Sequence, residues 1–166
     1  MSPAESDDEL LVLVGEDGTV LGSDRRAAVH DGRMRRHQAI SIVIDTPGGR
    51  LFQRRDPRKR AYPGLWDTSV SGHVAAGETY EQAAARELGE ELGLTGLGLR
   101  WIATVNVDLA DERERTALFV ASSSGPFSLI LGEVVAIAVF PDGIRPEPMG
   151  AATHAVLDVV DGALST

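Results

Sequence analysis

Apolar residues in this chain occur mostly in short runs separated by turn-forming residues, a pattern typical of β-strands. Residues 10–14 and 19–22 flank the turn signal Glu16-Asp17-Gly18 and predict a β-hairpin. Residues 37–45 are rich in β-branched side chains and lead into a proline–glycine turn. Further strands are predicted at residues 50–54, 67–70, 99–107, 117–122 and 133–140.

Two segments have the composition of helices. Residues 78–92 are rich in alanine and leucine, contain no proline and are followed by Gly93, which can end a helix. Residues 151–164 predict a final helix. Strands and hairpins around a central helix predict an α/β (α+β) fold with a mixed β-sheet. We expect residues 10–166 to form a single domain and residues 1–9 to be a flexible tail.

The composition narrows the classes of function. The 166 residues include no cysteine, which excludes disulfides, thiolate metal sites and cysteine nucleophiles. No apolar run approaches the roughly 20 residues that span a bilayer, and residues 1–9 lack a secretory-signal pattern. We therefore expect a cytoplasmic protein with no membrane partner. The net charge of −9 disfavours an extended nucleic acid, whereas basic clusters within residues 25–36 and 54–60 suit a small anionic ligand. The sequence is also compatible with a homodimer.

Three glutamates recur at helical spacing within the central helix. Glu87, Glu90 and Glu91 stand at positions i, i+3 and i+4, so their side chains fall within one arc of about 100°. Like charges at this spacing repel one another, and a hard divalent cation with oxygen ligands removes that cost. Taken alone, the pattern is more typical of an acidic, solvated helix face, so the surrounding residues have to decide between the two interpretations.

The residues around these glutamates match a known motif. The stretch GHVAAGETYEQAAARELGEELGL, residues 72–94, resembles the Nudix box G-x5-E-x7-R-E-U-x-E-E-x-G-U, where U is aliphatic, at every fixed position. The resemblance implies a Nudix-type α/β/α sandwich with a loop–helix–loop catalytic motif. It implies Mg²⁺, with Mn²⁺ as an alternative, held by Glu87, Glu90 and Glu91 beside Gly72. It further implies catalytic roles for Glu87, Glu91 and Arg86, and structural roles in the loop for Gly77 and Glu78.

A second, looser resemblance extends on both sides of the box. From about residue 10 to about residue 120 the chain is similar to the type I isopentenyl diphosphate isomerases and their hydrolase relatives. This implies that Arg55 and Lys59 bind a diphosphate, since guanidinium and ammonium groups are good phosphate partners. It implies a further set of metal ligands, which are His30, His37, His73, Glu112 and Glu114.

Aromatic residues are sparse in this chain. Trp66, beside Arg55 and Lys59 in sequence, is the candidate for a wall that faces the ligand. Trp101, Phe119 and Phe140 are expected in the core instead.

One departure from the isomerases bears on the reaction. Ser71 stands where those enzymes have a cysteine, and a hydroxyl is a far weaker acid than a thiol. Together with the complete box, this favours hydrolysis. We expect a metal-dependent hydrolase of a small organic diphosphate, either a nucleoside diphosphate derivative or a prenyl-type diphosphate, by attack of water at phosphorus. The alternatives are an isopentenyl diphosphate isomerase-like enzyme and a non-catalytic sensor of a diphosphate or nucleotide.

Overall fold

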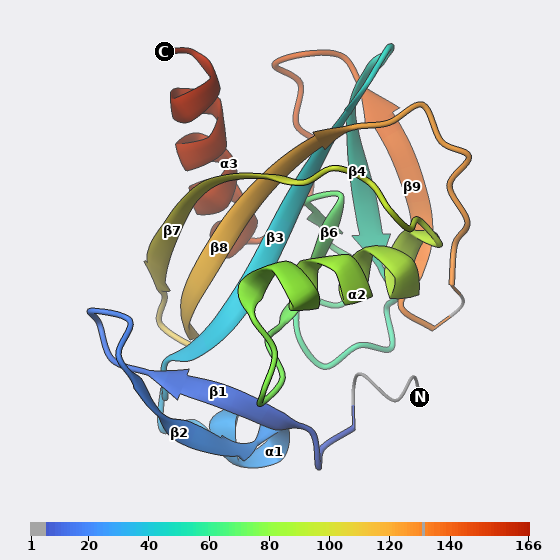
Figure 1. The fold of residues 1–166 in the computed structure, drawn as a ribbon. Coiled ribbons are helices and arrows are strands. Elements are labelled where there is room, and N and C mark those ends of the chain that lie inside the picture. Colours follow the sequence, from blue (N-terminus) through green and yellow to red (C-terminus); the bar gives the residue numbers. More distant parts are fainter. Residues whose placement is uncertain (1–5, 131) are drawn as a thin grey trace.

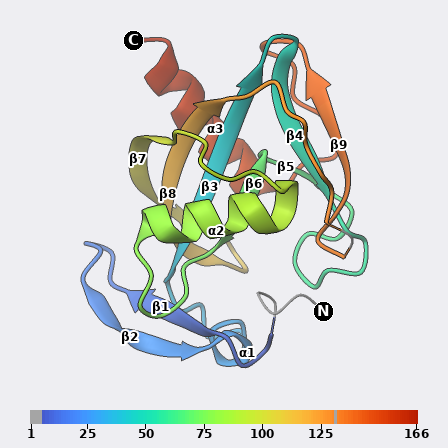
Figure 2. The ribbon, with the colours of Figure 1, turned by 45° about the vertical axis from the view of Figure 1, so that its right-hand side comes forward.

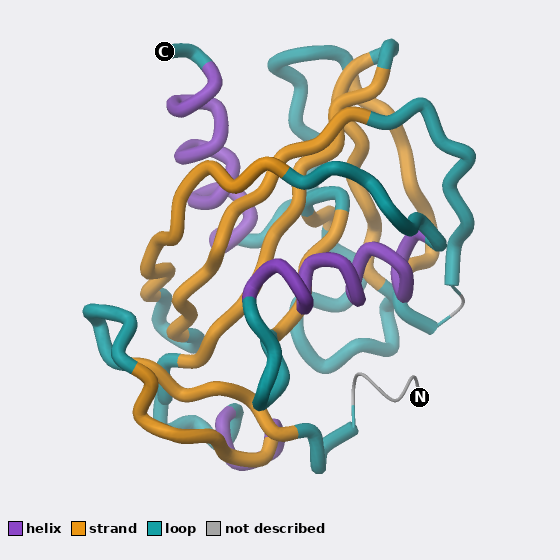
Figure 3. The backbone as a smooth tube through the Cα atoms, in the orientation of Figure 1, coloured by secondary structure: helices purple, strands orange, loops and turns teal. Residues whose placement is uncertain are grey.

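The computed structural model describes residues 6–130 and 132–166, which form one mixed sheet and three helices (Figures 1 and 3). The strands are β1 (Leu10–Val14), β2 (Val20–Arg25), β3 (His37–Thr46), β4 (Gly49–Arg55), β5 (Trp66–Asp67), β6 (Val70–His73), β7 (Arg100–Asp108), β8 (Arg113–Ser122) and β9 (Val134–Phe140). The helices are α1 (Arg26–Val29), α2 (Tyr80–Leu92) and α3 (Ala151–Leu164).

Strand β3 is the centre of the sheet. It runs parallel to β8 along its whole length and antiparallel to β6 and to the start of β4. Its side chains alternate between two cores, as the pleat of a strand requires. Ile40, Ile42 and Ile44 pack with α2, whereas Val43 packs with α3. Figures 1 and 2 show α2 and α3 on opposite faces of the sheet, so the predicted α/β/α sandwich with a mixed sheet is confirmed.

Helix α2 begins two residues later than the predicted start. Thr79 caps it, because its hydroxyl accepts a hydrogen bond from the Gln82 amide while the Gln82 side chain accepts one from the Thr79 amide. The helix ends at Gly93, whose φ of 64° is left-handed and favours glycine. Glu78 therefore lies outside the helix, where its carboxylate accepts a hydrogen bond from the Ala75 amide.

The predicted strand at residues 67–70 is wrong, because the chain changes partners there. Trp66–Asp67 pairs with β4, and Val70–His73 pairs with β3. Between them, buried Thr68 and Ser69 use their hydroxyls as hydrogen-bond partners for the neighbouring strands: the Ile44 amide donates to Ser69 Oγ over 2.8 Å. Because β3 and β4 pair only near their shared turn, this crossing keeps them apart and opens the sheet.

The structure differs from the sequence predictions in a few smaller points. Helix α1 was not predicted. Trp101 is not a core residue, because it lies on β7 with 56% of its surface exposed, whereas Phe119 is buried as expected. Of the expected tail at residues 1–9, residues 1–5 lie outside the described part, and Glu9 contacts Arg26. No helix among the described residues has the length and apolar character needed to cross a bilayer.

Candidate active site

A cavity of about 780 Å³ lies where β3 and β4 separate. Segments far apart in sequence line it: the middle of β3, all but the first residue of β6, one face of α2, the loop at residues 56–65, the turn before β8, and the first turns of α3. Its walls carry cationic, acidic and aliphatic side chains together. The size suits a small organic molecule.

Two of the three predicted glutamates face this cavity. Glu87 and Glu91 line it and are buried, with 8% and 2% of their surface exposed. Glu90 is not among its described lining residues, and its carboxylate accepts a hydrogen bond from Arg86 over 3.1 Å at the helix surface. The helical period explains the difference: relative to Glu87, Glu91 is rotated by about 40° one way and Glu90 by about 60° the other way.

Arg86 fixes the loop–helix geometry. Its guanidinium donates to both oxygens of Glu78 over 2.7 and 2.9 Å, to the His73 carbonyl over 3.0 Å and to Glu87 Oε1 over 2.7 Å. Gly72 has to be a glycine, because a Cβ atom there would lie 2.3 Å from the Glu87 carboxyl carbon. Gly77 has a left-handed φ of 89° in the same loop. The backbone of the loop at Gly72 therefore packs directly against the Glu87 side chain.

The buried carboxyls of α2 resist ionisation. Burial raises the pKa of Glu87 to about 7. Burial, and then the neighbouring Glu87, hold the pKa of Glu91 well above its usual value of 4.5. Glu91 Oε2 accepts hydrogen bonds from the Gln53 side chain over 2.8 Å and the Ser71 amide over 3.2 Å, which only partly offset the burial. Two adjacent carboxyls that ionise reluctantly are suited to holding or moving a proton.

This arrangement predicts a pH-dependent stability cost. A raised folded-state pKa stabilises the fold below the unfolded pKa of about 4.5 and loses that contribution as pH rises through the folded pKa. We expect Glu91→Gln, which resembles the protonated acid, to raise the free energy of unfolding by about 1–3 kcal/mol at pH 8 and by much less at pH 5. Urea unfolding of the metal-free protein at both pH values measures this. An equal change at both pH values would contradict it.

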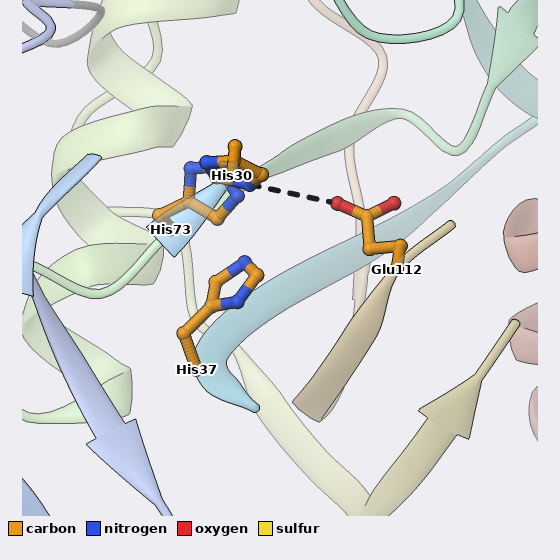
Figure 4. A group of neighbouring side chains, drawn as sticks. All are labelled: His30, His37, His73 and Glu112. Atoms are coloured by element: carbon orange, nitrogen blue, oxygen red, sulfur yellow. Dashed lines mark ion pairs between the residues drawn. The ribbon is translucent and has the colours of Figure 1, made fainter. Parts of the chain in front are cut away.

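A second group of donors lies at the cavity wall (Figure 4): His30, His73 and Glu112 line the cavity, and the His37 ring packs against both of these histidines from behind. His30, His37, His73 and Glu112 each offer one ligand atom, and these atoms lie within 4.8 Å of one another. Strand β3 brings them together, since Ala39 pairs with His73 on β6 and His37 pairs with Glu114 on β8. Glu114 Oε1 lies 3.6 Å from Nε2 of both His37 and His73. The histidine–glutamate cluster therefore contains all five side chains that the isomerase resemblance implied.

Two histidines of the cluster are held through Nδ1 by backbone carbonyls. Nδ1 of His30 lies 3.1 Å from the Arg26 carbonyl, and Nδ1 of His37 lies 3.1 Å from the Arg35 carbonyl. A carbonyl only accepts, so Nδ1 carries a proton in both rings, and Nε2 is the atom left for a ligand when the ring is neutral. Within residues 6–130 and 132–166, Nε2 of His37 is buried without a hydrogen-bond partner.

The charge states differ between two of the histidines. Burial, and then the neighbouring His37, Arg26 and His30, hold the pKa of His73 well below 6.5, so its imidazole is neutral. Burial also lowers the pKa of His37, but the carboxylate of Glu114 outweighs it and the pKa ends above the usual value. In turn, His37 outweighs the effect of burial on Glu114, whose pKa is lowered.

The predicted diphosphate-binding residues also line the cavity, each with a partner. Lys59 Nζ lies 2.6 Å from Glu133, and both side chains are more than 90% buried. Arg55 Nε donates to the Ala61 carbonyl over 3.1 Å, and its Nη1 lies 3.5 Å from Asp67. Trp66 is not among the described lining residues. Its ring packs edge-on against Phe140 at 5.5 Å, which corrects the expectation of a ligand-facing wall.

Asp67 is a further site residue that the sequence did not single out. Its carboxylate accepts hydrogen bonds from Ser71 Oγ over 2.8 Å and from Thr153 Oγ1 of α3 over 2.9 Å. Asp67 thereby connects Ser71 and the side chain of Arg55 to helix α3. Thr153 also lines the cavity, so the region after residue 125 contributes to the site.

A mixed sheet between two helices, with buried glutamates on a helix entered through a glycine loop, defines an α/β/α protein with a candidate site at the split in the sheet. The NUDIX domain model matches residues 34–149, and the chain belongs to the Nudix hydrolase family. An uncharacterised Nudix hydrolase of Pseudomonas aeruginosa is 38% identical over 144 residues, which cover 87% of this chain and 83% of that relative.

The chain is also similar to isopentenyl-diphosphate Delta-isomerases in sequence and to several solved structures in fold. The isopentenyl-diphosphate Delta-isomerase of Mycolicibacterium vanbaalenii is 39% identical over 95 residues, 57% of this chain and 52% of the isomerase, so the match spans about half of that enzyme. Among solved structures, DR0079 from Deinococcus radiodurans has a TM-score of 0.69 at 26% identity over 80% of this chain and 83% of its own. The predicted relation to both hydrolases and isomerases is therefore confirmed, and the chain is a hydrolase of this family.

Proposed function

We propose that this hydrolase uses a divalent metal ion to cleave a small organic diphosphate. The observation that carries the proposal is the meeting of three groups at one cavity: the buried carboxyls of Glu87 and Glu91, the cations Arg55 and Lys59, and the histidine–glutamate cluster, all of whose members except His37 line the cavity. Such a cavity offers a proton acceptor, an anion grip and a cation site together. A binding-only sensor has no need for the first of these.

The residues present fit a divalent ion. Among the described residues the buried Nε2 of His37 makes no hydrogen bond and has only Glu114 Oε1 near it, at 3.6 Å, although buried polar atoms are nearly always hydrogen-bonded, so the atom is suited to a ligand. Imidazole nitrogens with carboxylates suit Mn²⁺, Zn²⁺ or Co²⁺, and all-oxygen carboxylate sites suit Mg²⁺. His30, His37, His73, Glu112 and Glu114 would hold the former, and Glu87 and Glu91 would hold Mg²⁺. A bound ion would supply positive charge that polarises the P–O bond and acidifies water.

The chain's own side chains account for the remaining steps. Arg55 and Lys59 bind the non-bridging phosphate oxygens, for which Lys59 exchanges its contact with Glu133 for one with the substrate. Glu87, whose Oε1 is held by Arg86, accepts a proton from the attacking water. The new bond joins the water oxygen to phosphorus, and the bridging P–O bond breaks to release a phosphomonoester.

The cavity residues specify the organic group of the substrate less closely than its diphosphate. The cavity wall includes the aliphatic residues Ile40 and Val156, and Tyr62 is its one phenylalanine, tyrosine or tryptophan among the described residues. Aliphatic walls favour a prenyl-type tail, whereas a nucleobase would have mainly Tyr62 to stack on. We propose both classes as substrates to test, with the prenyl-type diphosphate first.

The test is a panel of nucleoside diphosphate derivatives, nucleotide sugars and prenyl diphosphates, followed by ³¹P NMR with Mg²⁺, Mn²⁺ or Zn²⁺ present. We expect one class to be converted to phosphomonoester or phosphate in a metal-dependent way. Turnover that is unaffected by a chelator would contradict the metal dependence. Tight binding without any phosphorus product across the panel would instead indicate a sensor.

The isomerase alternative rests on relatives named isopentenyl-diphosphate Delta-isomerase and on the histidine–glutamate cluster. Ser71 argues against it, because its hydroxyl is a weak acid that already donates to Asp67 over 2.8 Å. Incubation of isopentenyl diphosphate in D₂O separates the two reactions. We expect no deuterium in an allylic product, and incorporation would establish isomerisation.

A further inference from the structure

The loop at residues 56–65 connects the two halves of the site. It follows Arg55, carries Lys59, and presents Tyr62 to the cavity. Tyr62 has a φ of 51°, a left-handed conformation that is unfavourable for a bulky side chain and persists only where its surroundings fix it. The Leu65 amide donates to the Tyr62 carbonyl over 3.3 Å, and the ring lies beside Gly150.

The Tyr62 hydroxyl reaches the histidine–glutamate cluster. It donates to Glu112 Oε2 over 2.8 Å, while Glu112 Oε1 lies 3.8 Å from His30 Nε2. The two oxygens of this carboxylate therefore have separate partners, one in the cluster and one in the loop. A carboxylate that binds a cation is commonly oriented by such a hydrogen bond on its second oxygen.

The same loop fixes the diphosphate grip. Arg55 Nε donates to the carbonyl of Ala61, the residue before Tyr62, over 3.1 Å. The Lys59 amide donates to the Asp56 carbonyl over 3.0 Å at the start of the loop. A shift of Tyr62 therefore moves the backbone atom that orients Arg55. The path from Glu112 to Arg55 consists of one side-chain hydrogen bond, one peptide unit and a second hydrogen bond.

We propose that Tyr62 is a positioning residue that couples cation binding at the histidine–glutamate cluster to ordering of the 56–65 loop. The inference rests on the proposed function, because it needs a cation at the cluster. A cation that draws Glu112 into place also fixes Tyr62, and through it Arg55. Binding of the cation thereby prepares the diphosphate grip, and the diphosphate in turn favours the cation.

The test compares Tyr62→Phe with Tyr80→Phe. Each variant removes one tyrosine hydroxyl, and these are the chain's two tyrosines. Tyr80 Oη donates to the Arg115 carbonyl over 3.4 Å and does not line the cavity among the described residues. Co²⁺ alone is the probe: its visible absorption gives the affinity, and hydrogen exchange of residues 56–65 with and without Co²⁺ gives the coupling.

We expect Co²⁺ to slow exchange in the loop of the unsubstituted protein and of Tyr80→Phe. In Tyr62→Phe, Co²⁺ binds about 10-fold more weakly and, even at saturation, no longer slows exchange there. A purely structural role for Tyr62 would speed exchange equally with and without Co²⁺, which would overturn the inference. Equal affinity and equal protection in all three proteins would also overturn it. Absence of Co²⁺ binding by the unsubstituted protein would instead refute the proposed metal site, and the coupling with it.

Discussion

Glu87→Gln is expected to lower turnover of the panel substrate by at least about 100-fold while the protein stays folded. The buried carboxyl of Glu87 lines the cavity, and Gln can neither accept a proton at neutral pH nor supply an anionic ligand. The shape is preserved: Arg86 Nη1 can donate to the amide oxygen as it now donates to Oε1. Steady-state kinetics with ³¹P NMR or phosphate release measures the loss.

Glu81→Gln is the matched control for this substitution. Glu81 lies in the first turn of the same helix, is exposed, and does not line the cavity among the described residues. The two variants therefore make the same chemical change in one helix and differ only in whether the site is touched. We expect Glu81→Gln to retain full turnover. Full turnover in Glu87→Gln as well, with circular dichroism unchanged in both, would remove Glu87 from the mechanism.

The helix that carries Glu87 was predictable because its signals are local. Alanine-rich composition, the glycine that ends it and the spacing of the box all lie within residues 72–94. The sequence also placed Glu87, Glu90 and Glu91 on one arc, but it gave no reason to separate them. The separation depends on where the cavity lies relative to α2, on the side where Gly72 approaches Glu87 so closely that no side chain fits.

The remaining site contacts join residues that no local pattern relates. Lys59 and Glu133 are 74 residues apart, and Asp67 and Thr153 are 86 residues apart. The change of partner between β5 and β6, which opens the sheet, takes place at Thr68 and Ser69. These two residues lie inside the segment 67–70, whose sequence predicts one short strand. Sequence periodicity indicates which face of an element is buried. It does not indicate which polar side chains meet once the elements pack, so Tyr62 and Asp67 emerged only from the structure.

His37→Gln is expected to weaken binding of Co²⁺ or Zn²⁺ by more than about 100-fold. The Nε2 of His37 is the one fully buried side-chain atom of the cluster that lacks a hydrogen bond among the described residues, so a cation there would satisfy it. An imidazole lone pair is a far better ligand for these ions than an amide. Gln can still donate a hydrogen bond near the Arg35 carbonyl, where Nδ1 donates now. Titration followed by the visible absorption of Co²⁺ measures the affinity.

The metal should also stabilise the folded protein, because the cluster assembles His30, His37 and His73 from separate elements and is absent from the unfolded chain. At 100 times its dissociation constant, an ion adds about 2.7 kcal/mol to the free energy of unfolding. We expect a higher Tm with Zn²⁺ in the unsubstituted protein and almost no rise in His37→Gln. His154→Gln is the control, since His154 is the fourth histidine and pairs with Glu147 on the surface of α3. Equal stabilisation of all three proteins would place the ion elsewhere, and Glu87 and Glu91 would then be the next carboxylates to substitute.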